Sequence, residues 1–253
     1  MVDIIFDRKI YFDAIRDDPF KGRLTQKQVE GQEFILDVWE MTRAEQDVRW
    51  LAYCLATTIH ETASTMQPIE EYGKGKGHAY GKPHPETGET YYGRGFVQIT
   101  WYENYLKMTT ILRSMFPDKE IDLVQHPEEA LNPIYAAAIM FEGMEQGLFR
   151  SGHMLSRYFS NTRDDAYTAR EIINGDKTKV PSWSGGVNIG TLIAKYHTAF
   201  LRALVKARIE ILPPDVVPPV EPGIIVVNIQ APPGIPISVW VNGEEVHDDG
   251  NTS

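Results

Sequence analysis

Cysteine is almost absent from this chain, which has one, Cys54, among 253 residues. An intramolecular disulfide is therefore impossible, and the chain could be made in a reducing cytoplasm without consequence. Cys54 lies in an apolar run with helical character, and apart from His60 nothing nearby in the sequence would lower the pKa of its thiol. We therefore expect Cys54 to be a buried structural residue rather than a catalytic thiol.

Long apolar runs and an excess of basic residues are missing as well. No apolar run approaches the ~18–20 residues that span a bilayer, so we expect no integral membrane segment. The first eight residues lack a basic stretch followed by an apolar one, so we expect no secretory signal peptide. The net charge is −10, and no basic region marks nucleic acid as a partner.

The last forty or so residues differ in composition from the rest. Residues 213–222 hold five prolines, and residues 213–253 hold six acidic residues and no Lys or Arg. β-Branched runs around Asn242-Gly243 indicate strands joined by a turn. We therefore expect a main domain at 1–212, a Pro-rich linker at 213–223 and a small acidic β-rich tail at 224–253. This tail is too short for a core of its own, so it packs on the body, pairs with another chain or is partly disordered.

The first 212 residues are expected to be mainly α. Apolar residues at helical spacing predict two short helices between residues 7 and 42, and Thr25 with Gln28 has the pattern of a capping box. The clearest helix covers residues 47–63, and Glu61 lies beyond its apolar stripe. Further helices are expected at 105–116, 133–145, 155–159, 164–173 and 189–211. Residues 73–93 read as a long loop, and residues 96–101 as the best strand candidate.

The sequence excludes three kinds of site: a zinc-protease site, a serine-hydrolase site and a dinucleotide-binding loop. A zinc-protease helix needs a second histidine four residues after the first, and that position is Ser64. A serine hydrolase needs a Gly-x-Ser-x-Gly turn, which the chain lacks. Gly93-Arg94-Gly95 is too short for a dinucleotide loop. We expect neither a metal nor a cofactor, which leaves carboxylates as the catalytic groups.

Several short motifs in a fixed order accompany Glu61. They are His60-Glu61-Thr62, Tyr91-Tyr92-Gly93-Arg94-Gly95, Gln98-Ile99-Thr100, Asn104-Tyr105 and Ile172-Ile173-Asn174-Gly175. In these motifs the chain resembles glycoside hydrolase family 19, the chitinases and related phage and bacterial endolysins, over roughly residues 10–210. The resemblance implies a lysozyme-like, two-lobed helical domain with a cleft and a minor β element.

The resemblance also implies catalytic roles. Glu61 matches the general acid, and either Glu71 or Glu70 matches the general base that activates water. Endolysin-like members usually carry a basic residue before the Glu of Glu-Tyr-Gly, which favours Glu71. Thr100 matches a hydroxyl residue that helps to hold the water. An inverting glycosidase needs two carboxyl groups roughly 6.5–9.5 Å apart, and its acid must stay protonated near neutral pH.

Substrate contacts are implied for a second set of residues. Gln98, Asn104 and Asn174 match positions in the substrate groove of the family. Arg94 either forms a structural ion pair or contacts the substrate, and Tyr92 either stacks on a sugar ring or packs in the core. Glu103 departs from the plant chitinases, which have Tyr there, so the sugar contact at that position is not carried over.

Taken together, these patterns predict an endolysin-type muramidase. It would cleave, with inversion, the β-1,4 bonds between N-acetylated sugars of bacterial peptidoglycan. It would be made in the cytoplasm of a bacterial host and would act on the cell wall or in the periplasm, with a holin or a virion as partner. Two alternatives stay open: a chitinase acting on N-acetylglucosamine polymers, and a virion-associated structural or wall-binding protein with a lysin fold.

Overall fold

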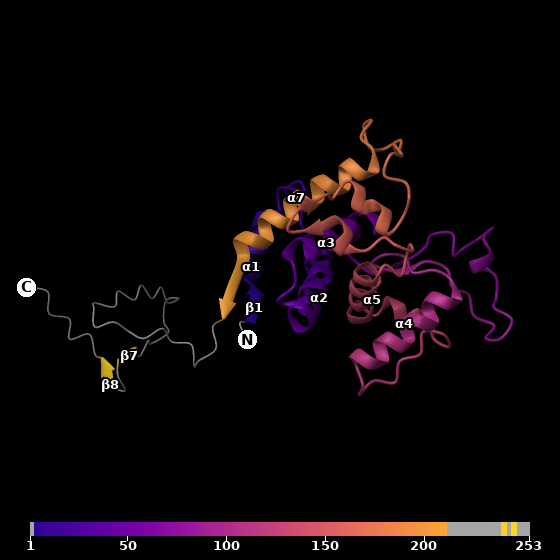
Figure 1. The fold of residues 1–253 in the computed structure, drawn as a ribbon, viewed down its shortest axis with the longest axis horizontal. Coiled ribbons are helices and arrows are strands. Elements are labelled where there is room, and N and C mark those ends of the chain that lie inside the picture. The colour runs from indigo at the N-terminus through magenta and orange to yellow at the C-terminus, as the bar shows by residue number, and fades with distance from the viewer. Residues whose placement is uncertain (1–2, 212–238, 242–243, 247–253) are drawn as a thin grey trace, which may run out of the picture. The chain divides into compact units, whose positions relative to one another are not determined.

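The computed structural model describes residues 3–211, 239–241 and 244–246 (Figure 1). The chain divides into two compact units, Met1–Pro213 and Pro214–Ser253. The linker predicted at 213–223 lies outside the described residues, as does the turn predicted at Asn242-Gly243. Within the second unit, strands β7 (Val239–Val241) and β8 (Glu244–Val246) form an antiparallel pair, so this part of the tail has the predicted strand character.

The first unit is mainly helical, as predicted. Helix α3 (Val48–Glu61) packs against α7 (Ile189–Ala207), and α7 also packs against α1 (Arg8–Ile15). Helix α2 (Gln26–Arg43) packs against α5 (Pro133–Gln146), which also contacts α4 (Tyr102–Met115) and the short α6 (Leu155–Tyr158). Figure 1 shows α7 lying along α3 across the body.

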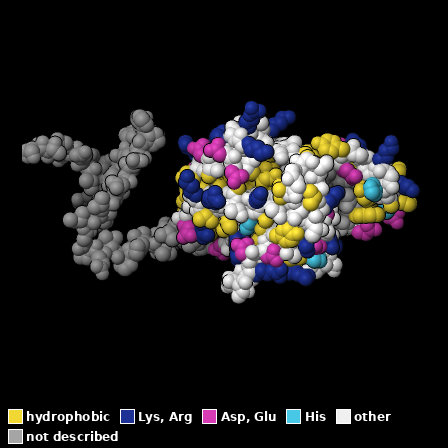
Figure 2. Space-filling view, turned by 90° about the horizontal axis from the view of Figure 1, so that it is seen from above, with side chains coloured by type: hydrophobic (Ala, Val, Ile, Leu, Met, Phe, Trp, Pro, Cys, Tyr) yellow, Lys and Arg dark blue, Asp and Glu magenta, His cyan; other side chains and the backbone are white. Residues whose placement is uncertain are grey.

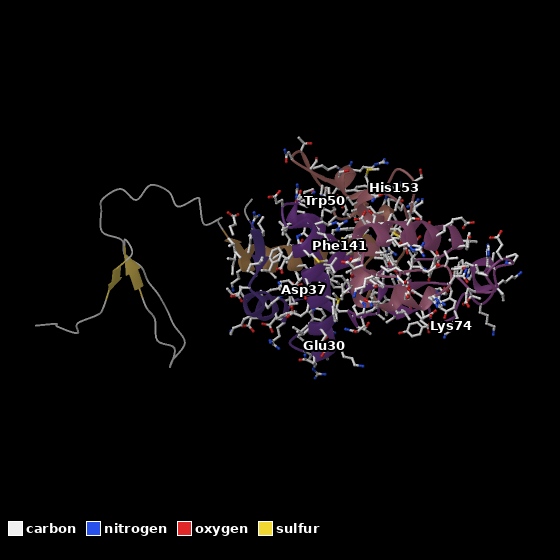
Figure 3. The ribbon with its side chains drawn as sticks, turned by 90° about the horizontal axis from the view of Figure 1, so that it is seen from below. Glu30, Asp37, Trp50, Lys74, Phe141 and His153 are labelled. Atoms are coloured by element: carbon white, nitrogen blue, oxygen red, sulfur yellow. The ribbon has the colours of Figure 1, made fainter. Side chains whose placement is uncertain are left out.

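Helix α3 forms the centre of the core because it is apolar on nearly all sides. All nine residues from Leu51 to Ile59 are buried, and Cys54 among them is fully buried, as expected. Burial raises the pKa of the Cys54 thiol, which makes it a poor nucleophile. Phe141 of α5 packs edge-on against Trp39, with ring centroids 5.4 Å apart, and lies inside the bundle (Figure 3).

The predicted capping box begins α2. The backbone N–H of Gln28 donates to Thr25 Oγ1 at 3.3 Å, and the backbone N–H of Thr25 donates to Gln28 Oε1 at 2.8 Å. These two bonds satisfy backbone donors that the helix itself leaves free. The helix that follows has 18 residues, so the expectation of two short helices holds for α1 and is wrong for α2.

The strands of the first unit are short and occur in antiparallel pairs. Strand β1 (Asp3–Phe6) pairs with β6 (Arg208–Ile211), β2 (Ile69–Glu70) with β3 (Arg94–Gly95), and β4 (Phe159–Ser160) with β5 (Arg163–Asp164). The helix predicted at 189–211 therefore ends at Ala207, because residues 208–211 take their hydrogen bonds from β1 instead.

Two further expectations from the sequence are wrong. Residues 96–101 form a tight turn rather than a strand, because Gln98 and Trp101 adopt positive φ angles of 57° and 73°, and Arg94 bridges back to Ile99. The helix expected at 164–173 is a 3₁₀ helix, η3 (Thr168–Ile172), preceded by strand β5.

The surface of the first unit carries both signs of charge. On the face shown in Figure 2, Lys and Arg side chains are interspersed with Asp and Glu side chains. No helix among the described residues has the length and apolar character needed to cross a membrane.

Candidate active site

Glu61 is the last residue of α3 and lies at the edge of the core. The helix ends there because the Thr62 backbone leaves the helical angles (φ −97°, ψ 18°) and Ala63 and Ser64 then adopt positive φ angles of 48° and 65°. The Glu61 side chain is 16% exposed and lines an open groove of about 330 Å³. The groove is lined by Glu61, Val97, Gln98, Ile99, Thr100, Trp101, Asn104, Phe149, Ile173 and Asn174.

Four residues expected in the site line this groove with Glu61. They are Gln98, Thr100, Asn104 and Asn174, and they come from the turn after β3, the first turn of α4 and the segment after η3. Gln98 Nε2 donates to Ile69 O at 2.9 Å and to Gly95 O at 3.1 Å, and Asn104 Nδ2 donates to Thr100 O at 2.8 Å. The two side chains are therefore held in place.

Arg170 is the direct partner of Glu61 and was not predicted from the sequence. It is 3% exposed, its Nη1 donates to Glu61 Oε1, and its Nε donates to Asp176 Oδ1 at 2.7 Å. Burial opposes the charged form, but Glu61 and Asp176 together hold the pKa of Arg170 above its ordinary value. The sequence signal that could have found Arg170 was its position, since Arg170 and Asp176 lie on either side of the motif that contains Asn174.

Glu70 and Glu71 lie in different surroundings, although they are adjacent in sequence. Glu70 is part of β2 and faces a cluster of donors, with the Tyr92 hydroxyl 2.6 Å and Lys74 Nζ 2.9 Å from its carboxylate. The hydrogen bond from Tyr92, followed by that from Lys74, lowers the pKa of Glu70. Lys74 lies near one end of the body (Figure 3).

Glu71 follows β2 and is not among the residues that line the groove. Its Oε2 accepts the Gly93 N–H at 3.2 Å, and its Oε1 accepts the Tyr80 hydroxyl at 3.4 Å. A Cβ atom added at Gly93 would lie 3.3 Å from Glu71 Cβ and 2.9 Å from Gln98 Oε1. Glu71 is therefore a neighbour of Gln98, which lines the groove.

Tyr92 and Arg94 are buried beneath the β2–β3 pair and are not among the residues that line the groove. The Arg94 guanidinium lies 3.7 Å from the centroid of the Tyr92 ring and donates to Thr90 O at 3.0 Å and to the Tyr105 hydroxyl at 3.1 Å. Arg94 Nε is 3.8 Å from Glu70 Oε1. The Arg94 guanidinium is therefore held by groups of the protein, and the Tyr92 hydroxyl by the Glu70 carboxylate.

Two exposed tryptophans lie near Glu61. Trp101 is 47% exposed and lines the groove, and Trp183 is 66% exposed. The Trp183 ring is 6.2 Å from the ring of His60, the residue before Glu61. Burial lowers the pKa of His60, so this imidazole is neutral at neutral pH.

Comparisons with known proteins give matches of structure but not of sequence. No protein-family model matches the chain, and a search of curated proteins finds no match. Solved structures that resemble it include a bacterial family 19 chitinase, with 18% identity, 79% of this chain and 94% of that chain covered, and a TM-score of 0.45. Chitinase C from Streptomyces griseus has 18% identity, coverage of 79% and 76%, and a TM-score of 0.48. A chitinase C mutant has 16% identity, coverage of 79% and 92%, and a TM-score of 0.42.

The groove contains carboxylate, amide, hydroxyl and indole side chains. Within the described part of the chain, no group of three or more His, Cys, Asp or Glu side chains is arranged to hold a metal ion. The groove instead offers a carboxylate, amides, a hydroxyl and an exposed indole, which are the groups that bind and cleave sugars.

Proposed function

We propose that the chain is a glycoside hydrolase that cleaves β-1,4 bonds between N-acetylated sugars of bacterial peptidoglycan, with inversion. The observation that carries the proposal is the position of Glu61 in one groove with Gln98, Thr100, Asn104 and Asn174. Sequence motifs separated by more than a hundred residues are brought together there, and each supplies the kind of side chain that the proposed chemistry needs.

Glu61 is the proposed general acid. In its present arrangement Arg170 is shared between Glu61 and Asp176, so two carboxylates surround one guanidinium. With both acids ionised this group carries one net negative charge. As the general acid, Glu61 would give a proton to the leaving-group oxygen when the glycosidic bond breaks.

Glu71 is the proposed general base, and Glu70 is a structural residue. The Glu70 carboxylate is occupied by Tyr92 and Lys74, with Arg94 close by, so it is stabilised as an anion that faces the protein. Each oxygen of Glu71 accepts one hydrogen bond and has a lone pair left for water. Thr100 is proposed to hold that water within reach of Glu71.

Peptidoglycan is proposed over chitin on the endolysin-like character of the motifs. On this proposal the enzyme is made in a bacterial host and reaches the wall through a holin or as part of a virion. The parallel digestion of purified peptidoglycan and of chitin oligomers tests the choice. Release of reducing ends from peptidoglycan alone supports the proposal, and release from chitin alone overturns the substrate assignment.

Matched carboxylate-to-amide variants test the catalytic roles. Glu61→Gln and Glu71→Gln should each lower the rate of turbidity loss of outer-membrane-permeabilised Gram-negative cells by about 10²–10⁴-fold. Glu70→Gln is the control, because it makes the same chemical change one residue away and should keep most of the activity. Equal clearing by Glu61→Gln and the unaltered protein would overturn the mechanism. A Glu70→Gln variant as inactive as Glu71→Gln would overturn the assignment of the base.

A further inference from the structure

Within the long loop between β2 and β3, residues 75–81 form a turn that is closed by a contact between two glycines. A Cβ atom added at Gly81 would lie 2.1 Å from Gly75 O, and one added at Gly75 would lie 2.5 Å from Gly81 Cα. Only glycine leaves room for the two backbone segments to approach this closely. The contact fixes the short 3₁₀ helix η1 (Ala79–Gly81), which carries Tyr80.

Tyr80 is held on three sides. Its backbone oxygen accepts the N–H of Tyr91 at 3.0 Å. Its ring stacks on His78, with centroids 5.0 Å apart and an interplanar angle of 3°, and meets Trp101 edge-on at 5.2 Å. Since Trp101 lines the groove, Tyr80 packs against one of the residues that form the groove wall.

The Tyr80 hydroxyl and the Gly93 N–H hold the two oxygens of the Glu71 carboxylate, at 3.4 Å and 3.2 Å. Burial, followed by the negative charge of Glu71, raises the pKa of Tyr80, so the hydroxyl stays protonated and can donate. A carboxylate held by one donor on each oxygen has a defined plane, which is what a base that aims at one water molecule requires.

We propose that Tyr80 is a positioning residue for Glu71, and that the contact between Gly75 and Gly81 fixes the place of its hydroxyl. The proposal rests on the proposed function, because Glu71 needs to be positioned only if it acts as the base. By donating to Oε1, Tyr80 orients the carboxylate.

The charged groups around Glu71 do not replace this donor. Lys74 Nζ and Arg94 Nε both face Glu70, at 2.9 Å and 3.8 Å. His78, the remaining titratable group near Tyr80, stacks on its ring rather than on Glu71. Glu61, which lines the groove, is paired with Arg170. The hydroxyl of Tyr80 is therefore the group whose removal acts on Glu71 without altering a charge.

Tyr80→Phe tests the proposal, and Tyr72→Phe is its matched control. Tyr72→Phe removes the same hydroxyl group from a residue of the same loop, but the Tyr72 side chain is 88% exposed. Tyr80→Phe should lower kcat about tenfold and leave KM nearly unchanged, because the ring remains and the lost hydrogen bond acts on the base. Tyr72→Phe should leave both kcat and KM unchanged.

Each outcome separates this proposal from the one on which it rests. An inactive Glu71→Gln variant together with an unchanged kcat in Tyr80→Phe overturns the role of Tyr80 and leaves the proposed function in place. An active Glu71→Gln variant overturns the base assignment itself. A Tyr80→Phe variant in which kcat and KM both deteriorate, with a lower melting temperature, shows that Tyr80 only supports the fold and also overturns the proposal.

Discussion

Replacing Arg170 with methionine removes the guanidinium that Glu61 and Asp176 share. Arg170 is 3% exposed, whereas the side chains of Glu61 and Asp176 are 16% and 21% exposed. Methionine fills similar space but supplies no charge. The substitution therefore leaves two carboxylates close together, each without its partner and each with limited access to water.

The expected loss of stability follows from that geometry. Removing one partner of a buried ion pair costs about 3–5 kcal/mol, because the remaining charge is left uncompensated. Both carboxylates keep some exposure, so water takes part of the role of the guanidinium and the lower end applies, about 3 kcal/mol. For a unit of this size, about 2–4 °C per kcal/mol corresponds to a fall in Tm of roughly 6–12 °C.

A double-mutant cycle in urea measures the part of this loss that involves Glu61. Glu61→Gln alone should cost about 1 kcal/mol, because the amide oxygen can still accept from Arg170. With Arg170→Met already present, Glu61→Gln relieves a repulsion, so the loss in the double variant should fall short of the sum of the two single losses by more than about 1 kcal/mol. Arg16→Met, at a side chain 48% exposed with a carboxylate 3.6 Å away, is the control and should change stability by less than about 0.5 kcal/mol. Additive losses, or a loss for Arg170→Met as small as that of the control, would refute the reasoning.

Three further predictions concern other parts of the first unit. Thr25→Ala should lower the free energy of unfolding by about 1 kcal/mol in urea denaturation, because it removes the acceptor for the Gln28 N–H at the start of α2. Gly81→Ala should displace Tyr80 and lower the hydrolysis rate as much as Tyr80→Phe or more, because its Cβ would lie 2.1 Å from Gly75 O. Lys177 and Arg150 hold the pKa of Glu171 at about 2, below the ordinary 4.5, so its contribution to stability is present above pH 4.5 and is lost as the pH falls toward 2. The Tm difference between the unaltered protein and Glu171→Gln should therefore be larger at about pH 6 than at about pH 3.

Local pattern was enough to predict most helices. The apolar stripe of α3 and the Thr25–Gln28 capping box involve residues within a few turns of one another, so the sequence contains the whole signal. The end of α7 was not predictable in this way. Residues 208–211 continue an apolar helical pattern, but the partner that makes them a strand is β1, about two hundred residues earlier.

The turn at 96–101 failed as a strand prediction for a different reason. Alternation of polar and apolar residues is typical of strands, but Gln98 and Trp101 take positive φ angles that few side chains other than glycine adopt. The structure around them holds that backbone. With the backbone in this conformation, Gln98, Thr100 and Trp101 all line the groove.

Site residues that belong to a short motif could be named from the sequence, whereas contacts between residues far apart in the chain could not. Glu61, Gln98, Thr100, Asn104 and Asn174 were named from short motifs, and they line one groove. Arg170 meets Glu61 across 109 positions of sequence, a contact that no local pattern announces. The choice between Glu70 and Glu71 likewise depended on which of two adjacent side chains faces Tyr92 and Lys74.

The pairing of β1 with β6 has a consequence for how the chain folds. Asp3 lies opposite Ile211, and Phe6 lies opposite Arg208, so the pair joins the two ends of a loop that contains every helix of the first unit. Closing so long a loop is entropically slow and is rewarded only when both strands are present. During synthesis β1 must therefore wait for β6 to leave the ribosome. A chain shortened to Ala207 would keep every helix of this unit but leave the edge of β1 open to pairing with another molecule.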